Sequence, residues 1–128
     1  MNISNLKILV AEDNPMNVLL MRKLLAKWDI TPDFAANGSA AVEAFKTSNY
    51  DLILMDIHMP IMSGYEATAI IRSDADPLKA KTIIIALTAS VGPEIKEKMV
   101  EYDINDFVLK PFNKDELKTK LEEIASKK

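Results

Sequence analysis

Acidic side chains directly follow two of the apolar runs in this 128-residue sequence. Glu12 and Asp13 come after LKILVA, and Asp56 comes after LILM. Carboxylates that gather in one place repel one another, and the arrangement becomes favourable when a divalent cation lies among them. Mg²⁺ needs few carboxylates and takes its other ligands from water and phosphate, whereas Ca²⁺ needs more oxygen ligands. The acids therefore predict a magnesium site that handles a phosphorylated substrate or intermediate.

Asp56 is the candidate nucleophile of this group. An aspartate can accept a phosphoryl group as an aspartyl phosphate, and the charge on the transferring oxygens then needs neutralisation. Lys110, in FVLKPF, and Thr88, directly after TIIIAL, add an ammonium and a hydroxyl after two further apolar runs. We expect Mg²⁺ and Lys110 to neutralise the phosphoryl charge, and Thr88 to donate a hydrogen bond to a phosphoryl oxygen.

Each of these residues also has an ordinary structural explanation when it is considered alone. Acids favour the first turn of a helix, a threonine often caps a strand end, and a lysine in a turn is commonly solvated. A functional site is favoured because all five residues lie at the carboxyl ends of predicted strands, where α/β sheets bind their ligands. By contrast, the side chain of His58 is better explained as a solvent-facing loop residue, and the neighbouring methionines as packing.

The elements that must position these residues alternate along the chain. Continuous apolar runs predict five strands, at residues 6–11, 31–36, 52–55, 82–87 and 106–109. Apolar stripes and capping residues predict five helices, at 15–28, 39–47 with Ser39 as N-cap, 65–72, 93–102 and around 117–124. Residues 73–81 are expected to be a polar surface connection. This alternation predicts a doubly wound α/β fold with a parallel sheet covered on both faces.

The composition restricts the class of protein. A length of 128 residues with 48% apolar residues fits one domain over residues 1–128. The net charge of -3 argues against direct binding to nucleic acid. The chain has no cysteine, one histidine, no leader-like N-terminus and only strand-sized apolar runs. We therefore expect a cytoplasmic domain without membrane contact and without thiolate metal sites.

Four motifs together resemble a known family. LVAEDNP, LILMDIHMPIMSGYEA, IIALTA and FVLKPF, in this order and spacing, closely resemble the receiver domain of two-component response regulators over essentially the entire chain. EDNPMN and MDIHMPIMSGYEAT are most similar to the receivers of hybrid sensor histidine kinases, and a stand-alone receiver is the alternative. The resemblance implies a flavodoxin-like, five-stranded sheet in the order 2-1-3-4-5 with five helices.

The resemblance also implies a role for each candidate residue. Asp56 matches the phosphoacceptor, and Thr88 and Lys110 match the switch hydroxyl and the phosphate-binding lysine. Mg²⁺ would be held by the side chains of Glu12, Asp13 and Asp56 and by the backbone carbonyl of His58. The expected function is phosphorelay signalling by a phosphoacceptor that catalyses its own phosphorylation and dephosphorylation. It would not be an enzyme with a separate substrate.

Switching in this family involves an aromatic residue on the last strand, which Phe107 matches. Phosphorylation draws the threonine toward the phosphoryl group and the aromatic turns inward, because a new dianion biases a two-state element. The Lys110–Pro111 peptide bond is expected to be cis. Asp103 departs from the family pattern, because relatives often have glycine at this position. His58 and Ser90 match positions at which family members tune the lifetime of the aspartyl phosphate.

The implied partner is a sensor histidine kinase or a histidine phosphotransfer protein, and a homodimer on activation is a further expectation. The partner's phosphohistidine must approach Asp56 over the first turn of the first helix. We therefore hypothesise that the partner docks on Asn17, Leu20, Pro111 and Phe112.

Three alternatives stay open at the level of the sequence. An aspartate-nucleophile phosphohydrolase usually carries two acids at positions i and i+2 after its first strand, and this chain has Glu12-Asp13-Asn14-Pro15 instead. A flavin-binding domain would need phosphate-cradling donors where this chain has acids. An interaction module that no longer accepts phosphate usually lacks an acid or the lysine, and neither is missing here.

Overall fold

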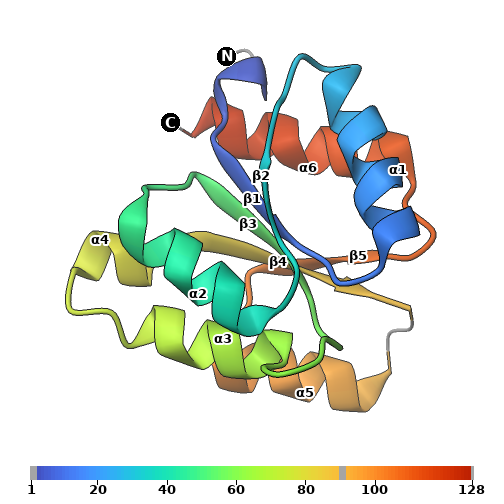
Figure 1. Cartoon of the computed structure of the whole chain (residues 1–128). Helices are drawn as coiled ribbons and strands as arrows, with labels where there is room; N and C mark the ends of the chain where they lie inside the picture. Colours follow the sequence, from blue (N-terminus) through green and yellow to red (C-terminus); the bar gives the residue numbers. More distant parts are fainter. Residues whose placement is uncertain (1–2, 90–91, 128) are drawn as a thin grey trace.

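Five parallel strands form a single sheet in the order β2-β1-β3-β4-β5 (Figure 1). The computed structural model describes residues 3–89 and 92–127. Every neighbouring pair of strands is parallel. The α/β class and the strand order expected from the sequence are therefore confirmed. The strands are β1 (Ile8–Ala11), β2 (Asp33–Ala35), β3 (Leu52–Asp56), β4 (Ile83–Thr88) and β5 (Asp106–Leu109).

The helices include one that the sequence analysis did not predict. The short helix α4 (Pro77–Ala80) lies within residues 73–81. None of these residues is buried, as expected for a surface connection, but the expectation of five helices is wrong. The side chain of Asp76 accepts a hydrogen bond from the backbone N–H of Leu78, and Pro77 occupies the first turn, which together start a helix. The other helices are α1 (Pro15–Ala26), α2 (Gly38–Thr47), α3 (Gly64–Arg72), α5 (Pro93–Tyr102) and α6 (Lys114–Ser126), with a 3₁₀ turn η1 (Ile3–Asn5) before β1.

Polar side chains cap the helices near the carboxyl ends of the strands. Asn14 caps α1 as predicted, because its side chain accepts a hydrogen bond from Met16 N at 2.9 Å. The predicted cap of α2, Ser39, is wrong: Asn37 caps this helix by accepting from Ala40 N at 2.8 Å, and the helix begins at Gly38. An extended Asn37 leaves its side chain free to reach the first turn, so the earlier residue takes the role.

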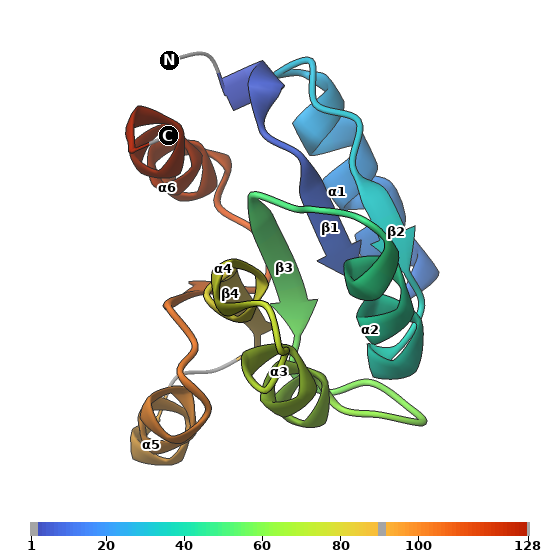
Figure 2. The same cartoon turned by 90° about the vertical axis from the view of Figure 1, so that its left-hand side faces the viewer.

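Helices cover both faces of the sheet (Figures 1 and 2). Helices α1 and α6 lie on one face, and α2, α3 and α5 lie on the other. Side chains alternate along each strand, so that Leu54 packs in the core of the first face while Ile53 and Met55 pack in the core of the second. This two-sided burial explains the continuous apolar runs in the sequence. None of the helices in the described ranges has the length and apolarity needed to cross a membrane.

The loop between β3 and α3 is fixed by backbone hydrogen bonds. Gly64 N donates to the carbonyl of Ile57 (2.9 Å), and Gly38 N donates to the carbonyl of Met62 (3.0 Å). Within the loop, Met62 N donates to the carbonyl of Pro60 at 2.7 Å, across Ile61, whose φ is 69°. A three-residue turn with a positive central φ is rare and strained. The loop that follows Asp56 is therefore held tightly against both β3 and α2.

Candidate functional site

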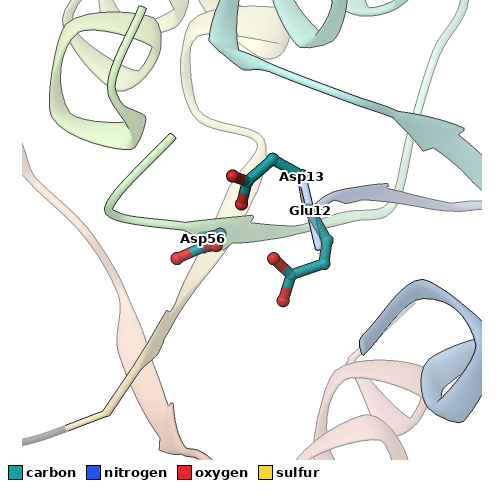
Figure 3. Close-up of side chains that lie close together, drawn as sticks. All are labelled: Glu12, Asp13 and Asp56. Carbon is teal, nitrogen blue, oxygen red and sulfur yellow. The ribbon is translucent and has the colours of Figure 1, made fainter. Parts of the chain in front are cut away.

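Three carboxylates meet at the carboxyl edge of the sheet (Figure 3). Glu12 and Asp13 directly follow β1, and Asp56 is the last residue of the neighbouring strand β3. One carboxylate oxygen from each residue lies within 4.8 Å of the other two. Glu12 and Asp56 are buried, whereas Asp13 is exposed. The cluster lies between β1 and β3, where the strand order reverses, the usual position of a ligand site in a doubly wound sheet.

Lys110 reaches this cluster from the end of β5. Its Nζ lies 2.9 Å from Oε1 of Glu12 and 3.1 Å from Oδ2 of Asp56. The backbone fixes its starting point, because Lys110 N donates to the carbonyl of Thr88 at 2.8 Å. The following Lys110–Pro111 peptide bond is cis, as expected. One ammonium thus bridges two buried carboxylates of neighbouring strands.

The two buried carboxylates affect each other's ionisation. Burial, together with the hydrogen bond and the negative charge of Glu12, raises the pKa of Asp56 to about 7. Burial also opposes ionisation of Glu12, but hydrogen bonds with Asp56 and Lys110 outweigh it and lower the pKa of Glu12. For Lys110, burial is likewise outweighed by the two carboxylates, which raise its pKa. Without a metal ion, Glu12 and Asp56 therefore share a proton near neutral pH.

This charge arrangement predicts that Asp56→Asn stabilises the metal-free chain at high pH. In the folded state Asp56 keeps its proton up to about pH 7, whereas in the unfolded chain it ionises near 3.8, the ordinary pKa of an aspartate side chain. Between pH 3.8 and about pH 7 the folded state therefore binds more protons than the unfolded state. The Asp56 carboxyl group thus lowers the free energy of unfolding as the pH rises through this range. With allowance for solvent screening at the edge of the site, we expect Asp56→Asn to gain about 1–2 kcal/mol at pH 8.

Urea unfolding in the presence of a chelator measures this difference. The gain should shrink toward zero near pH 4, because both forms of position 56 are then neutral. Asp33→Asn is a suitable control, because that carboxylate lies on the outer strand β2 and accepts a hydrogen bond from Tyr50 Oη at 2.7 Å. A gain at position 56 that is equal at both pH values would contradict the carboxylate pairing.

The donor atoms at the site suit a hard divalent cation. The cluster offers oxygen ligands only, two of them on buried side chains, and Mg²⁺ binds to few carboxylates while retaining water. His58, whose carbonyl is a predicted further ligand, follows Asp56 by two residues and has an exposed side chain. Its backbone N–H donates to Oδ1 of Asp56 at 3.2 Å, which orients that carboxylate. The residues present therefore fit a magnesium ion.

The two predicted switch residues lie on β4 and β5. Thr88 ends β4 and is buried, one residue beyond Leu87, which pairs with Asp56 across the sheet. Phe107 on β5 is half-buried and packs against the core on the α2, α3 and α5 face, a core that Ile95 of α5 also contacts. Ser90, matched to residues that tune the phosphate lifetime, lies outside the described residues.

An apolar groove of about 440 Å³ runs between α1 and the segment after β5. Three of the four hypothesised docking residues line it, Leu20, Pro111 and Phe112, whereas Asn17 is not among its lining residues. Leu20 is 52% exposed, so the groove has an apolar wall open to a partner. The rest of the lining was not predicted: Lys23, Leu24 and Lys27 from α1 and its C-cap, and Lys114 from the start of α6. The helical spacing from Leu20 could have indicated Lys23, Leu24 and Lys27, whereas Lys114 lies on another helix.

Comparison with known proteins places the chain in a family. Residues 8–122 match the family model described as the response regulator receiver domain. Hybrid signal transduction histidine kinase B of Dictyostelium discoideum is 42% identical over 120 residues, which cover 87% of this chain. They cover only 6% of that relative, so the chain spans a small part of its length.

Two solved structures are similar in both fold and sequence. One is the receiver domain of sensor histidine kinase PA1611 from Pseudomonas aeruginosa, with a magnesium ion coordinated in its active site cleft. It has a TM-score of 0.85 and 34% identity, covering 94% of this chain and 98% of that one. The other, with a TM-score of 0.83 and 34% identity, covers 91% of this chain and 86% of that one. It is a Saccharomyces cerevisiae complex of the histidine phosphotransfer protein Ypd1 and the receiver domain of the response regulator Ssk1.

The matched residues include both strands that carry the acidic cluster and the strand that precedes Lys110. The fold, the strand order and the charged site at the carboxyl edge of the sheet agree with this match. The chain therefore belongs to the response regulator receiver domain family.

Proposed function

We propose that residues 1–128 form one magnesium-dependent phosphoacceptor domain, in which Asp56 takes a phosphoryl group from a partner's phosphohistidine. The observation that carries this proposal is the position of Lys110, whose ammonium lies within 3.1 Å of the phosphoacceptor carboxylate and within 2.9 Å of a second acid. A cation in this place neutralises charge on a phosphoryl group attached to Asp56. The proposed location is the cytoplasm, where ATP supplies phosphoryl groups to histidine kinases.

The proposed reaction has two steps. In the first, an oxygen of Asp56 forms a bond to phosphorus while the P–N bond to the partner's histidine breaks, and the leaving imidazole takes up a proton. In the second, water attacks phosphorus, the bond to Asp56 breaks, and inorganic phosphate leaves. Glu12, Asp13, Asp56 and the carbonyl of His58 would hold Mg²⁺, which supplies further positive charge to the phosphoryl oxygens.

The proposed output is a change on the surface formed by α5, β5 and α6. Thr88 is buried at the end of β4, within the same edge of the sheet as Asp56, and its hydroxyl would turn toward a phosphoryl group. Phe107 lies on the neighbouring strand β5 and packs against the same core as Ile95 of α5. A change at Thr88 would reach this surface through β5, whose residue Leu109 pairs with Thr88. Homodimer formation through this surface on activation is part of the proposal.

The decisive experiment uses a small phosphodonor in place of a partner. With Mg²⁺ and acetyl phosphate, we expect intact mass spectrometry to detect one phosphoryl adduct that hydroxylamine removes and that Asp56→Asn lacks. A folded, Mg²⁺-binding chain that forms no adduct would instead favour an interaction module that does not accept phosphate. Rapid turnover of phosphate esters would favour a phosphohydrolase.

We also propose that a histidine kinase or histidine phosphotransfer protein docks on the groove beside α1. The basic rim formed by Lys23, Lys27 and Lys114 around apolar walls suits a partner surface that is apolar at its centre and acidic at its margin. The Ypd1–Ssk1 complex supports the class of partner, because it joins a similar receiver to a histidine phosphotransfer protein.

Replacing Leu20 separates docking from chemistry. We expect Leu20→Asp to slow transfer from a phosphorylated histidine phosphotransfer protein at least about tenfold, because it places an unpaired charge in an apolar contact. The rate with acetyl phosphate should stay unchanged. Leu78→Asp is a matched control, because Leu78 is 84% exposed on α4, before the start of β4 and far from the carboxyl edge. Equal transfer rates for wild type and Leu20→Asp would contradict this docking surface.

A further inference from the structure

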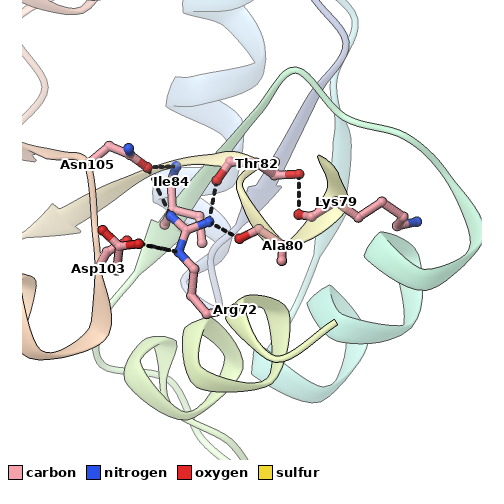
Figure 4. Close-up of polar contacts among 7 residues, drawn as sticks. All are labelled: Arg72, Lys79, Ala80, Thr82, Ile84, Asp103 and Asn105. Carbon is pink, nitrogen blue, oxygen red and sulfur yellow. Dashed lines mark hydrogen bonds and ion pairs between the residues drawn. The ribbon is translucent and has the colours of Figure 1, made fainter. Parts of the chain in front are cut away.

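Arg72, the last residue of α3, joins two chain connections at the edge where the strands begin (Figure 4). Its Nη1 donates to the carbonyls of Ala80 (2.8 Å) and Thr82 (2.7 Å), just before β4. Its Nε donates to the carbonyl of Asp103 (2.9 Å), and its Nη2 donates to Oδ1 of Asn105 (3.0 Å), both between α5 and β5. We call these five residues the Arg72 clamp.

The clamp depends on geometry more than on charge. The Arg72 side chain is only 14% exposed, yet its close partners are neutral oxygens. The carboxylate of Asp103 lies 3.8 Å from Nε and is 85% exposed, so it contributes little. Asn105 extends the clamp to β4, because its Oδ1 also accepts from Ile84 N at 2.8 Å and its backbone N donates to Ile84 O at 3.0 Å. A planar guanidinium is the side chain that can satisfy several such acceptors at once.

Helix α5 is weakly held at its N-terminal end, which lies away from the Arg72 clamp. None of its residues from Pro93 to Tyr102 is buried, and its N-cap, Gly92, offers no side-chain hydrogen bond. At the other end, Asp103 adopts a left-handed conformation with φ 57°, and Ile104 N donates to the carbonyl of Met99 at 2.8 Å. The rings of Tyr102 and Tyr65 also stack there, 5.3 Å apart. Near the N-terminal end of α5, Ile95 packs against the core and is only partly buried. The hydrogen-bond and ring-stacking contacts of α5 described above lie at its C-terminal end.

We propose that the Arg72 clamp is the pivot of α5. The N-terminal end of α5, the end nearer to Thr88 along the chain, swings on phosphorylation while residues 103–105 stay in place. Because β5 begins directly after the clamp, its pairing with β4, including Ala86 with Phe107, keeps its register during the swing. The response to phosphorylation rests on the proposed function, whereas the clamp itself does not. Arg72 is in this view a positioning residue.

Hydrogen exchange of the unphosphorylated chain tests the clamp independently of phosphorylation. We expect Arg72→Met to speed exchange of the amides of Ile104 and Asn105 at least tenfold more than that of Leu54 in the central strand β3. Arg72→Lys should give a similar change, since it keeps the positive charge but loses the planar guanidinium that donates to several acceptors. This variant replaces Arg72→Met in the test if Arg72→Met does not fold. Asp103→Gly should leave exchange within threefold of wild type, because it keeps the carbonyl and suits the left-handed backbone.

Hydrogen exchange in the presence of Mg²⁺ and acetyl phosphate then tests the swing. Mass spectrometry verifies that the adduct has formed. In wild type, exchange should change at least threefold at Lys96 and Glu97, in the N-terminal half of α5, and less than twofold at Ile104 and Asn105. In Arg72→Lys the change should spread to Ile104 and Asn105. Two results would overturn the pivot. One is wild-type exchange rates at Ile104 and Asn105 in Arg72→Lys without phosphodonor, and the other is a change on phosphorylation of wild type that centres on residues 103–105. Absence of the adduct would count against the proposed function only, since the exchange comparison without phosphodonor still decides the clamp.

Discussion

Lys110→Met is expected to slow adduct formation from acetyl phosphate about 100-fold while strengthening the binding of Mg²⁺. In the metal-free chain the ammonium lies 2.9 Å from Glu12 and 3.1 Å from Asp56, two of the carboxylates that would hold the metal. Its removal leaves these acids without a counterion, so a divalent cation gains affinity. The transferring phosphoryl group, however, loses a preorganised positive charge, and losing one such contact typically costs about 10²–10³ in rate.

The two effects are measured separately, by titration of Mg²⁺ and by the rate of mass increase at saturating Mg²⁺. Lys120→Met is a matched control, because Lys120 forms a similar half-exposed ion pair with Asp106 at 2.6 Å on β5 and α6. It should leave both quantities within about twofold of wild type, since it does not contact the acidic cluster. A Lys110→Met variant that loses Mg²⁺ binding together with phosphorylation would show that the lysine supports the metal site instead of the phosphoryl group.

The residues of the site were predictable because each follows a continuous apolar run. In a parallel sheet such runs end at one edge, so the sequence positions of Glu12, Asp56, Thr88 and Lys110 already indicate one region of the fold. The contacts between them were less predictable. Lys110 must reach across β4 to Asp56 and across β3 and β4 to Glu12. These contacts depend on the strand order, which came from the family resemblance and not from the spacing of residues.

Features built from backbone atoms gave little signal in the sequence. The partners of Arg72 are mostly main-chain carbonyls 8 and more residues away, so a basic residue at the end of a helix predicts only a favourable dipole interaction. Helix α4 spans one turn, too short for an apolar stripe. Ile61 was equally unpredictable, because β-branched residues are among the last expected at a positive φ.

Gly64→Ala is expected to destabilise the chain by about 2–4 kcal/mol and to reduce phosphorylation of Asp56 as well. A Cβ at Gly64 would overlap the carbonyl oxygen of Asp56 and would lie 2.9 Å from Cα of Ile57. Both obstacles are backbone atoms of β3 and of the residue after it, so no side-chain rotation can relieve the overlap. Either α3 or the end of β3 must shift, and costs of this size are typical of overpacked sites.

Urea unfolding and the acetyl phosphate assay together separate strain from simple loss of a glycine. Gly92→Ala is the matched control, because a Cβ there meets no atom of the described residues within 4 Å, and the cost of alanine at the N-cap of α5 should stay within about 1 kcal/mol. The backbone N–H of Gly64 donates to Ile57 O, which ties the first turn of α3 to the residue after Asp56. Displacing α3 therefore moves Asp56 relative to Lys110, and the rate of adduct formation should fall even under conditions where the variant is fully folded. If Gly64→Ala were destabilised but phosphorylated at the wild-type rate, the loop after β3 would be a support for the fold alone and not for the position of the phosphoacceptor.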